Sequence, residues 1–167
     1  VIRHTLSSMG VNFDVWFKES SLYENNNFEK VIDKLIYKNL AYRKQGAVWF
    51  RSSNFGDDKD RVIIRKDGQP TYFASDIMYL INKSERGFDK IFYIWGADHH
   101  GYVDRLMATA RALGLDDMEV IIIIGQLVKL VKSGQLVKMS RRKGKVYTLA
   151  DLIEEVGPDA VRYFFAA

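Results

Sequence analysis

The sequence contains no cysteine, and this absence excludes two structural devices. Neither a disulfide framework nor a metal site built on thiolates can form in the chain. The lack of cysteine is compatible with a reducing cytoplasm, which is the location we expect. No run of about 18 apolar residues occurs either, so we predict no membrane-spanning helix. The two common nucleotide-binding fingerprints, the GxGxxG turn and the Walker A loop, are also missing.

Both ends of the sequence resemble cuts in a longer protein. Residues 1–4 include no initiator methionine and no signal-peptide pattern. Residues 161–167 stop inside an apolar run that has the spacing of a helix. At 167 residues, the chain is long enough for one domain, or for one domain with an inserted subdomain. We therefore expect a segment of a larger chain.

Positive charge is concentrated in one stretch, residues 120–150. The whole chain has 25 Lys and Arg residues against 21 Asp and Glu residues. The stretch has seven cations and no acid, whereas the other residues carry 18 cations against 21 acids. The net charge of +4 therefore comes from this stretch and not from the surface as a whole. The seven cations are Lys129, Lys132, Lys138, Arg141, Arg142, Lys143 and Lys145.

The cationic stretch ends in Val137-Lys138-Met139-Ser140-Arg141-Arg142-Lys143-Gly144. A small serine among cations, followed by glycine, suits a mobile loop that closes over phosphate groups. Cations that tighten on the charge that develops during phosphoryl or nucleotidyl transfer lower its barrier. A solvated basic loop, or a patch that binds nucleic acid without chemistry, would have the same charge. Charge alone leaves these interpretations open.

Strands and helices alternate in residues 71–167, which indicates an α/β fold with a doubly wound parallel sheet. The run 120–124 is apolar throughout, as expected of a strand that is buried on both faces of such a sheet. Thr148 and Asp151 have the spacing of a helix-capping box. We expect strands at 91–95 and 120–124, and helices at 75–86, 102–113 and 149–156 and from 159 onward.

Residues 1–70 have a different pattern and are expected to form a small α+β subdomain inserted beside that sheet. The paired carboxylates Asp57 and Asp58 lie in a turn, where bonding to the backbone is their common role and binding of a cation a rarer one. We expect strands at 11–17, 47–51 and 61–65, a helix at 28–42 capped by Asn27, and a hairpin turn at 66–68.

Polar residues follow the strand at 91–95, at the edge where a parallel sheet binds ligands. Gly96 lets a backbone approach closely, and Asp98 can accept hydrogen bonds from ribose hydroxyls. His99 and His100 are adjacent, so on a regular element they point in different directions and do not converge on a metal. They suit contacts to a nucleotide or an amino acid, or a turn in which both histidines are satisfied locally.

Tyr72 and Asp76 stand four residues apart where a helix is expected to begin, so both can face one pocket. A carboxylate in a pocket can bind a guanidinium group through a bidentate pair of hydrogen bonds. At a helix start, however, such residues are commonly a packed ring and a partner of the helix dipole.

Taken together, these motifs resemble bacterial arginyl-tRNA synthetases, a family of class I aminoacyl-tRNA synthetases. The run from Lys138 to Arg142 is similar to their KMSKS loop, with Arg141 where the second lysine usually stands. That difference keeps the charge but replaces a compact ammonium with a planar guanidinium. The resemblance keeps one order and spacing over nearly the whole chain, in residues 13–17, 19–23, 55–61, 67–77, 85–89, 95–103, 138–144, 148–149 and 157–162.

The resemblance implies the second half of a class I Rossmann-type catalytic domain and the activity of an arginine–tRNA ligase in protein synthesis. Members of this family activate arginine with ATP and Mg²⁺ and transfer it to the tRNA for arginine, and we expect a monomeric full-length protein that does not bind membranes. The implied site residues are Tyr72, Asp76 and His99 for arginine, Gly96, Asp98, Val137, Lys138 and Met139 for ATP, and Lys138, Ser140 and Arg141 for catalysis.

The HIGH signature of the family is absent from these 167 residues. His4 lacks its context, and His99 and His100 belong to another motif. We therefore expect the chain to carry half an active site and to be inactive by itself. Two other interpretations remain. One is another class I synthetase or a nucleotidyltransferase, which the charge of the amino-acid pocket would distinguish. The other is a non-catalytic RNA-binding module, which would bind RNA with a steep salt dependence and no response to ATP.

Overall fold

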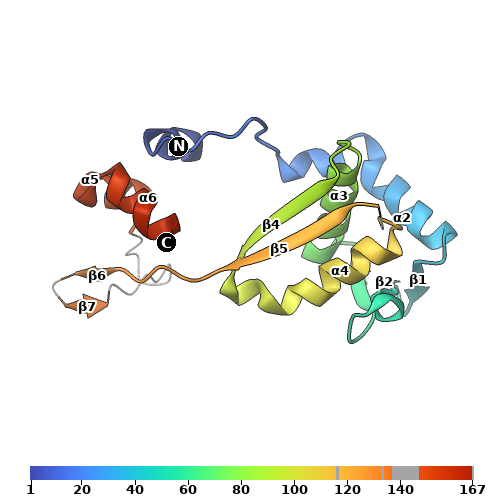
Figure 1. Cartoon of the computed structure of the whole chain (residues 1–167). Helices are drawn as coiled ribbons and strands as arrows, with labels where there is room; N and C mark the ends of the chain where they lie inside the picture. Colours follow the sequence, from blue (N-terminus) through green and yellow to red (C-terminus); the bar gives the residue numbers. More distant parts are fainter. Residues whose placement is uncertain (116, 133, 137–146, 167) are drawn as a thin grey trace. The chain divides into compact units, whose positions relative to one another are not determined.

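The structure, a computed structural model, describes residues 1–115, 117–132, 134–136 and 147–166, and the chain divides into two compact units (Figure 1). One unit is Phe17–Gln126, and the other joins Val1–Trp16 to Leu127–Ala167. The predicted phosphate loop at 137–144 lies outside the described residues. The predicted subdomain boundary after residue 70 is not a boundary of these compact units, and it stays a prediction about the architecture of the family.

The Phe17–Gln126 unit contains a three-stranded antiparallel sheet. Its strands β1 (Ala41–Lys44), β2 (Ala47–Phe50) and β3 (Arg61–Ile64) lie side by side in chain order. Gln45 and Gly46 join β1 to β2 with φ values of 52° and 79°, the left-handed conformation that a two-residue hairpin turn requires. Strands β2 and β3 confirm the predicted ones, whereas β1 was not predicted, and its first two residues, Ala41 and Tyr42, were expected to end the helix.

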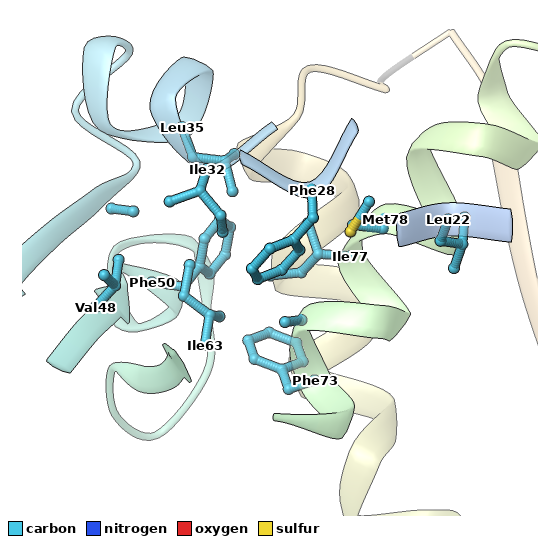
Figure 2. Packing of buried hydrophobic residues seen from close by; sticks show 12 residues of the cluster. Leu22, Phe28, Ile32, Leu35, Val48, Phe50, Ile63, Phe73, Ile77 and Met78 are labelled. Carbon is cyan, nitrogen blue, oxygen red and sulfur yellow. The ribbon is translucent and has the colours of Figure 1, made fainter. Parts of the chain in front are cut away.

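Two helices pack on this sheet. The helix α2 (Asn27–Tyr37) follows a 3₁₀ segment, η1 (Glu19–Asn26), and α3 (Tyr72–Ser84) follows β3. Helix α2 ends five residues earlier than predicted, because the chain turns after Tyr37 through Asn39 at a φ of 56°. Figure 2 shows how its apolar face meets side chains of the sheet and of α3. The labelled residues are Leu22, Phe28, Ile32, Leu35, Val48, Phe50, Ile63, Phe73, Ile77 and Met78.

We predicted Ser75 as the N-cap of α3, but the helix begins four residues earlier, and this shift matters for the site. Thr71 is its N-cap, and the Thr71 hydroxyl accepts a hydrogen bond from the Ala74 amide at 3.4 Å. Ser75 is buried instead of capping the helix, and its hydroxyl forms a 2.6 Å hydrogen bond with the Tyr23 hydroxyl. Tyr72 and Asp76 therefore lie on the first two turns of a capped helix.

The parallel strands β4 (Lys90–Gly96) and β5 (Glu119–Gly125) confirm the predicted α/β pattern. Their register brings Gly96 beside Gly125, so both strands end at the same edge. Helix α3 and α4 (Val103–Ala112) cover one face of the pair. The cluster under them consists of Leu80, Ile91, Tyr93, Leu106 and Ala110.

Two predictions of burial and pairing are wrong. The opposite face of β4 and β5 exposes Phe92, Ile94 and Ile123, because helices cover this pair on one side. Residues 11–17 form no strand. Their alternating pattern does resemble one, but no other segment of the described chain pairs with them, and Phe13 is exposed.

The second unit consists of short elements. They are α1 (Ile2–Ser8), a small antiparallel hairpin of β6 (Val131–Lys132) and β7 (Gln135–Leu136), α5 (Leu149–Val156) and α6 (Pro158–Ala166). The predicted capping box is confirmed: Thr148 accepts from the Asp151 amide at 3.1 Å, and the Thr148 amide donates to the Asp151 carboxylate at 2.8 Å. Within the described ranges, no helix has both the length and the apolar character needed to cross a membrane.

Candidate functional site

A cavity of about 320 Å³ lies at the carboxyl end of β4, between the first turns of α3 and of α4. This is the edge at which a parallel sheet was expected to bind a ligand. Aromatic rings form most of its wall, and an acid and a guanidinium also line it. Its lining residues are Tyr72, Phe73, Asp76, Trp95, His99, Tyr102, Arg105 and Leu106.

The structure brings together the three residues that were predicted to bind an amino acid. Tyr72 and Asp76 are one turn apart on α3, and His99 follows β4 in the 3₁₀ segment η3 (Ala97–Tyr102). Tyr72 is 85% exposed and stands at the opening of the cavity. The N-cap at Thr71 fixes the start of α3 and so sets the direction of these side chains.

Asp76 is a carboxylate without a partner. Within the described residues it forms no hydrogen bond and no ion pair. Asp76 is an exposed residue, yet the surrounding cavity walls desolvate its carboxyl group enough to raise its pKa. The negative charge of Glu19 raises that pKa further, while Arg105 and His99 oppose the rise. A ligand cation at Asp76 would therefore relieve an unfavourable charge.

A second hollow, of about 310 Å³, shares Tyr72 and Asp76 with the cavity and adds another acid, Glu19. Its remaining lining residues, among them Phe17 and Tyr79, carry no charge. The field on this side of Asp76 is therefore negative, and it favours a cationic group. Sequence reasoning missed Glu19 as a neighbour of Asp76, because the two residues are far apart in the chain and no periodicity links them.

The predicted ribose-binding residues lie next to the cavity. A Cβ atom at Gly96 would be 2.7 Å from Asp98 Oδ1, so a side chain at that position would displace the Asp98 carboxylate. His99 Nε2 is 3.7 Å from Asp98 Oδ2, and the His99 ring is near the rings of Trp95 and Tyr102, with centroids 6.2 and 5.7 Å away. His100 does not line the cavity. The two adjacent histidines thus point differently, as expected.

Arg105 is the charged residue of the cavity that sequence reasoning did not identify. It lies on α4, three residues after Tyr102, so that both face the cavity. The spacing of His99, Tyr102 and Arg105 at intervals of three was the available signal. The motif comparison stopped before the last of them.

Two groups of predicted residues fall elsewhere. Asp57 and Asp58 both contact Arg61, which accounts for their charges without a cation. No cluster of three or more potential metal ligands occurs in the part of the chain that the structure describes. The predicted loop residues Val137, Lys138, Met139, Ser140 and Arg141 lie outside the described residues.

Comparison with known proteins identifies similar sequences and folds along the chain. The family described as class I tRNA synthetases (R), catalytic domain, matches residues 1–164. The arginine–tRNA ligase of Carboxydothermus hydrogenoformans is 50% identical over 98% of this chain and 29% of its own length. The arginine–tRNA ligase of Bacillus subtilis is 53% identical over 99% of this chain and 30% of its own length. The chain thus spans less than a third of these relatives.

Solved structures agree with the sequence comparison. A structure assigned to an arginyl-tRNA synthetase from Campylobacter jejuni has a TM-score of 0.86 and 40% identity, and it covers 98% of this chain and 35% of that one. The arginyl-tRNA synthetase of Thermus thermophilus has a TM-score of 0.65 over 74% of this chain and 28% of its own. At 14% identity, that second similarity shows the fold alone.

Proposed function

Because this chain belongs to the family of class I tRNA synthetase (R) catalytic domains, we propose that it supplies the arginine pocket and part of the ATP site of an arginine–tRNA ligase. In the first step, a carboxylate oxygen of arginine bonds to the α-phosphorus of ATP, and the bond to pyrophosphate breaks. In the second step, a hydroxyl of the tRNA attacks the acyl carbon, and AMP leaves. The unpaired carboxylate of Asp76 in an aromatic cavity at the end of β4 is the observation that carries this proposal.

In this proposal, Asp76 binds the guanidinium group of arginine. A planar guanidinium and a carboxylate match in a bidentate geometry, and the Glu19 charge strengthens the negative field around them. Tyr72 covers the opening of the cavity, and its ring can stack on the guanidinium plane. His99 borders the amino acid on the side of β4, where the nucleotide is expected.

The proposed ATP site adjoins this pocket. Gly96 leaves room beside the strand end, and the exposed Asp98 carboxylate accepts hydrogen bonds from the ribose. We propose on sequence grounds alone that Lys138, Ser140 and Arg141 stabilise the charge on the α-phosphate, and that the backbone of Val137 and Met139 contacts adenine. Mg²⁺ would enter with ATP, bound by its phosphate groups.

The tRNA for arginine as the acceptor, a monomeric full-length protein and a cytoplasmic location remain predictions of the family resemblance. The alternative of another class I synthetase is less favoured, because two acids beside the cavity select a cationic amino acid. An RNA-binding module without chemistry would need no such cavity. Its signature would be RNA binding that depends steeply on salt and ignores ATP.

The test is pyrophosphate exchange by the protein expressed at its full genomic length, with arginine and tRNA present. We expect exchange with arginine but not with lysine. Asp76→Asn should lower kcat/KM for arginine at least about a hundredfold, because it removes a charged partner of a charged ligand group. The matched control is Asp33→Asn, a change of an exposed acid on α2 outside the cavity. Equal use of lysine, or normal exchange by Asp76→Asn, would contradict the proposal.

We also propose that the 167-residue chain, which lacks the HIGH signature, does not catalyse the reaction alone. In the family that signature lies in the first half of the nucleotide fold. Exchange above background by the chain itself, dependent on arginine and tRNA, would refute this proposal.

A further inference from the structure

The guanidinium group of Arg105 lies in the cavity without a carboxylate partner. Its central carbon is 4.4 Å from the centroid of the Tyr102 ring and 5.5 Å from that of Phe73. It forms no hydrogen bond or ion pair through its side chain with any described residue, Asp76 included, although both line the same cavity. Its Nε atom is buried and lacks an acceptor. Two aromatic rings thus flank a guanidinium group that has no acceptor among the described residues.

An unmade hydrogen bond of this kind calls for a physical explanation, since buried donors in folded proteins nearly always have acceptors. A guanidinium has five donors in one plane, and because Nε of Arg105 is buried, a ligand in the cavity would meet the terminal nitrogens of the group. The partner that suits these nitrogens is a planar anion that accepts two hydrogen bonds. A carboxylate is such an anion, and the cavity is the available space for it.

The charges around the cavity have a direction. Glu19 lines only the second hollow, Arg105 lines only the cavity, and Asp76 lines both. An amino acid with a cationic side chain has opposite charges at its two ends. The acids can hold the side chain while the cation holds the backbone carboxylate. The cavity also contains His99, whose Nε2 atom is 3.7 Å from Oδ2 of Asp98, the residue proposed to contact the ribose of ATP.

We propose that Arg105 binds the α-carboxylate of the amino acid, so that the pocket recognises both charged ends of arginine. This inference deepens the proposed function and rests on it. The α-phosphate of ATP is a second anion with the same chemistry, and the test separates the two sources. A residue that holds the carboxylate changes the use of arginine, whereas one that holds the phosphate changes the use of ATP.

The experiment compares arginine with agmatine, which has the same guanidinium group but no carboxylate. In the protein at full genomic length, Arg105→Gln should raise the KM for arginine about tenfold or more, because a charged hydrogen-bonding partner is lost. The inhibition constant of agmatine and the KM for ATP should stay within about twofold. Asp76→Asn should weaken arginine and agmatine alike. Equal weakening of both ligands in Arg105→Gln, or a rise in the KM for ATP alone, overturns the proposal.

Two further variants keep the result interpretable. Arg86→Gln is the matched control, because Arg86 also lies over aromatic rings, those of Phe17 and Tyr79, but does not line the cavity. It should leave all three constants unchanged. Arg105→Lys keeps the charge and the stem but loses the planar edge, so an intermediate rise in the KM for arginine is expected even if Arg105→Gln folds poorly. If the wild-type protein shows no exchange with arginine, the proposed function fails; if it does and the agmatine ratio is unchanged, this inference fails alone.

Discussion

The chain contains two sets of aspartate and arginine residues that differ in whether the charges meet. At the start of β3, Arg61 donates from Nε and from a terminal nitrogen to the two carboxylate oxygens of Asp57, at 2.8 and 2.7 Å. The Asp57 side chain is 3% exposed. In the cavity, Asp76 and Arg105 line one space without pairing with each other. We call the first set closed, because its charges pair with each other, and the second set open, because its charges do not.

The electrostatic consequences are opposite. Hydrogen bonds from Arg61 hold the pKa of Asp57 well below its ordinary range, so its charge supports the fold. Desolvation raises the pKa of Asp76, with Glu19 adding to the rise, so its charge opposes the fold until a cation binds. Residue type is the same in both places. The difference shows that satisfied charges build the scaffold, while unsatisfied charges mark the site that a ligand completes.

The largest expected effect is on the closed set. Asp57→Asn should lower the free energy of unfolding by about 3 kcal/mol, because it removes two charged hydrogen bonds of Arg61 and leaves only the contact with the exposed Asp58. Urea unfolding of the 167-residue chain, followed by circular dichroism, measures this value. Asp58→Asn is the matched control, since Asp58 is 66% exposed and should contribute much less. Equal losses of unfolding free energy in the two variants would show that Asp57 contributes no more to stability than the exposed Asp58.

Double-mutant cycles sharpen the comparison. Combining Asp57→Asn with Arg61→Gln should give a coupling energy in unfolding of about 1.5 to 3 kcal/mol, as for residues in direct contact. Combining Asp76→Asn with Arg105→Gln should give less than about 0.5 kcal/mol, because those groups do not pair. A large coupling in the cavity would mean that the two residues pair in solution. Asp76 and Arg105 would then neutralise each other, and neither would be left unpaired for a ligand.

Much of the parallel sheet and half of the site were predictable, because their signals are local. The apolar runs gave strands β4 and β5, and the spacing of Tyr72 and Asp76 placed both on one helical face. The Thr148–Asp151 capping box was also correct, since its hydrogen bonds lie within one turn. Each of these features depends on residues that are close together in the chain.

The errors arose where tertiary context decides. Residues 11–17 alternate like a strand but have no pairing segment in the described chain, and residues 38–42 are not helical because Asn39 turns the backbone. Arg105 was missed because the feature that singles it out is a buried Nε atom without a hydrogen-bond acceptor. A sequence does not show which hydrogen bonds are unmade. The loop at 137–144 stays a prediction from motif and charge.

The pH dependence of stability should also differ between the two sets. The lowered pKa of Asp57 stabilises the fold at pH values above the pKa of an unfolded aspartate, near 4, and this contribution is lost as the pH falls further. We expect a loss of about 2 kcal/mol attributable to this pair between pH 5 and pH 2. Urea titrations at several pH values measure it, with Asp57→Asn as the reference that lacks it. Parallel curves for the two proteins would show that Asp57 has no such role.

The smallest expected effect concerns Asp76, and its sign is opposite. A raised carboxyl pKa means that the ionised group costs stability at neutral pH, so Asp76→Asn should stabilise the chain there. Because the side chain opens to solvent, the gain should stay within about 0.5 kcal/mol. The gain should vanish as the pH falls through the raised pKa, where the wild-type carboxyl group becomes neutral as well. Paired unfolding curves at pH 7 and pH 4 test this. A loss of stability at pH 7 would show that Asp76 already has a partner in the fold, and that binding of arginine must displace it.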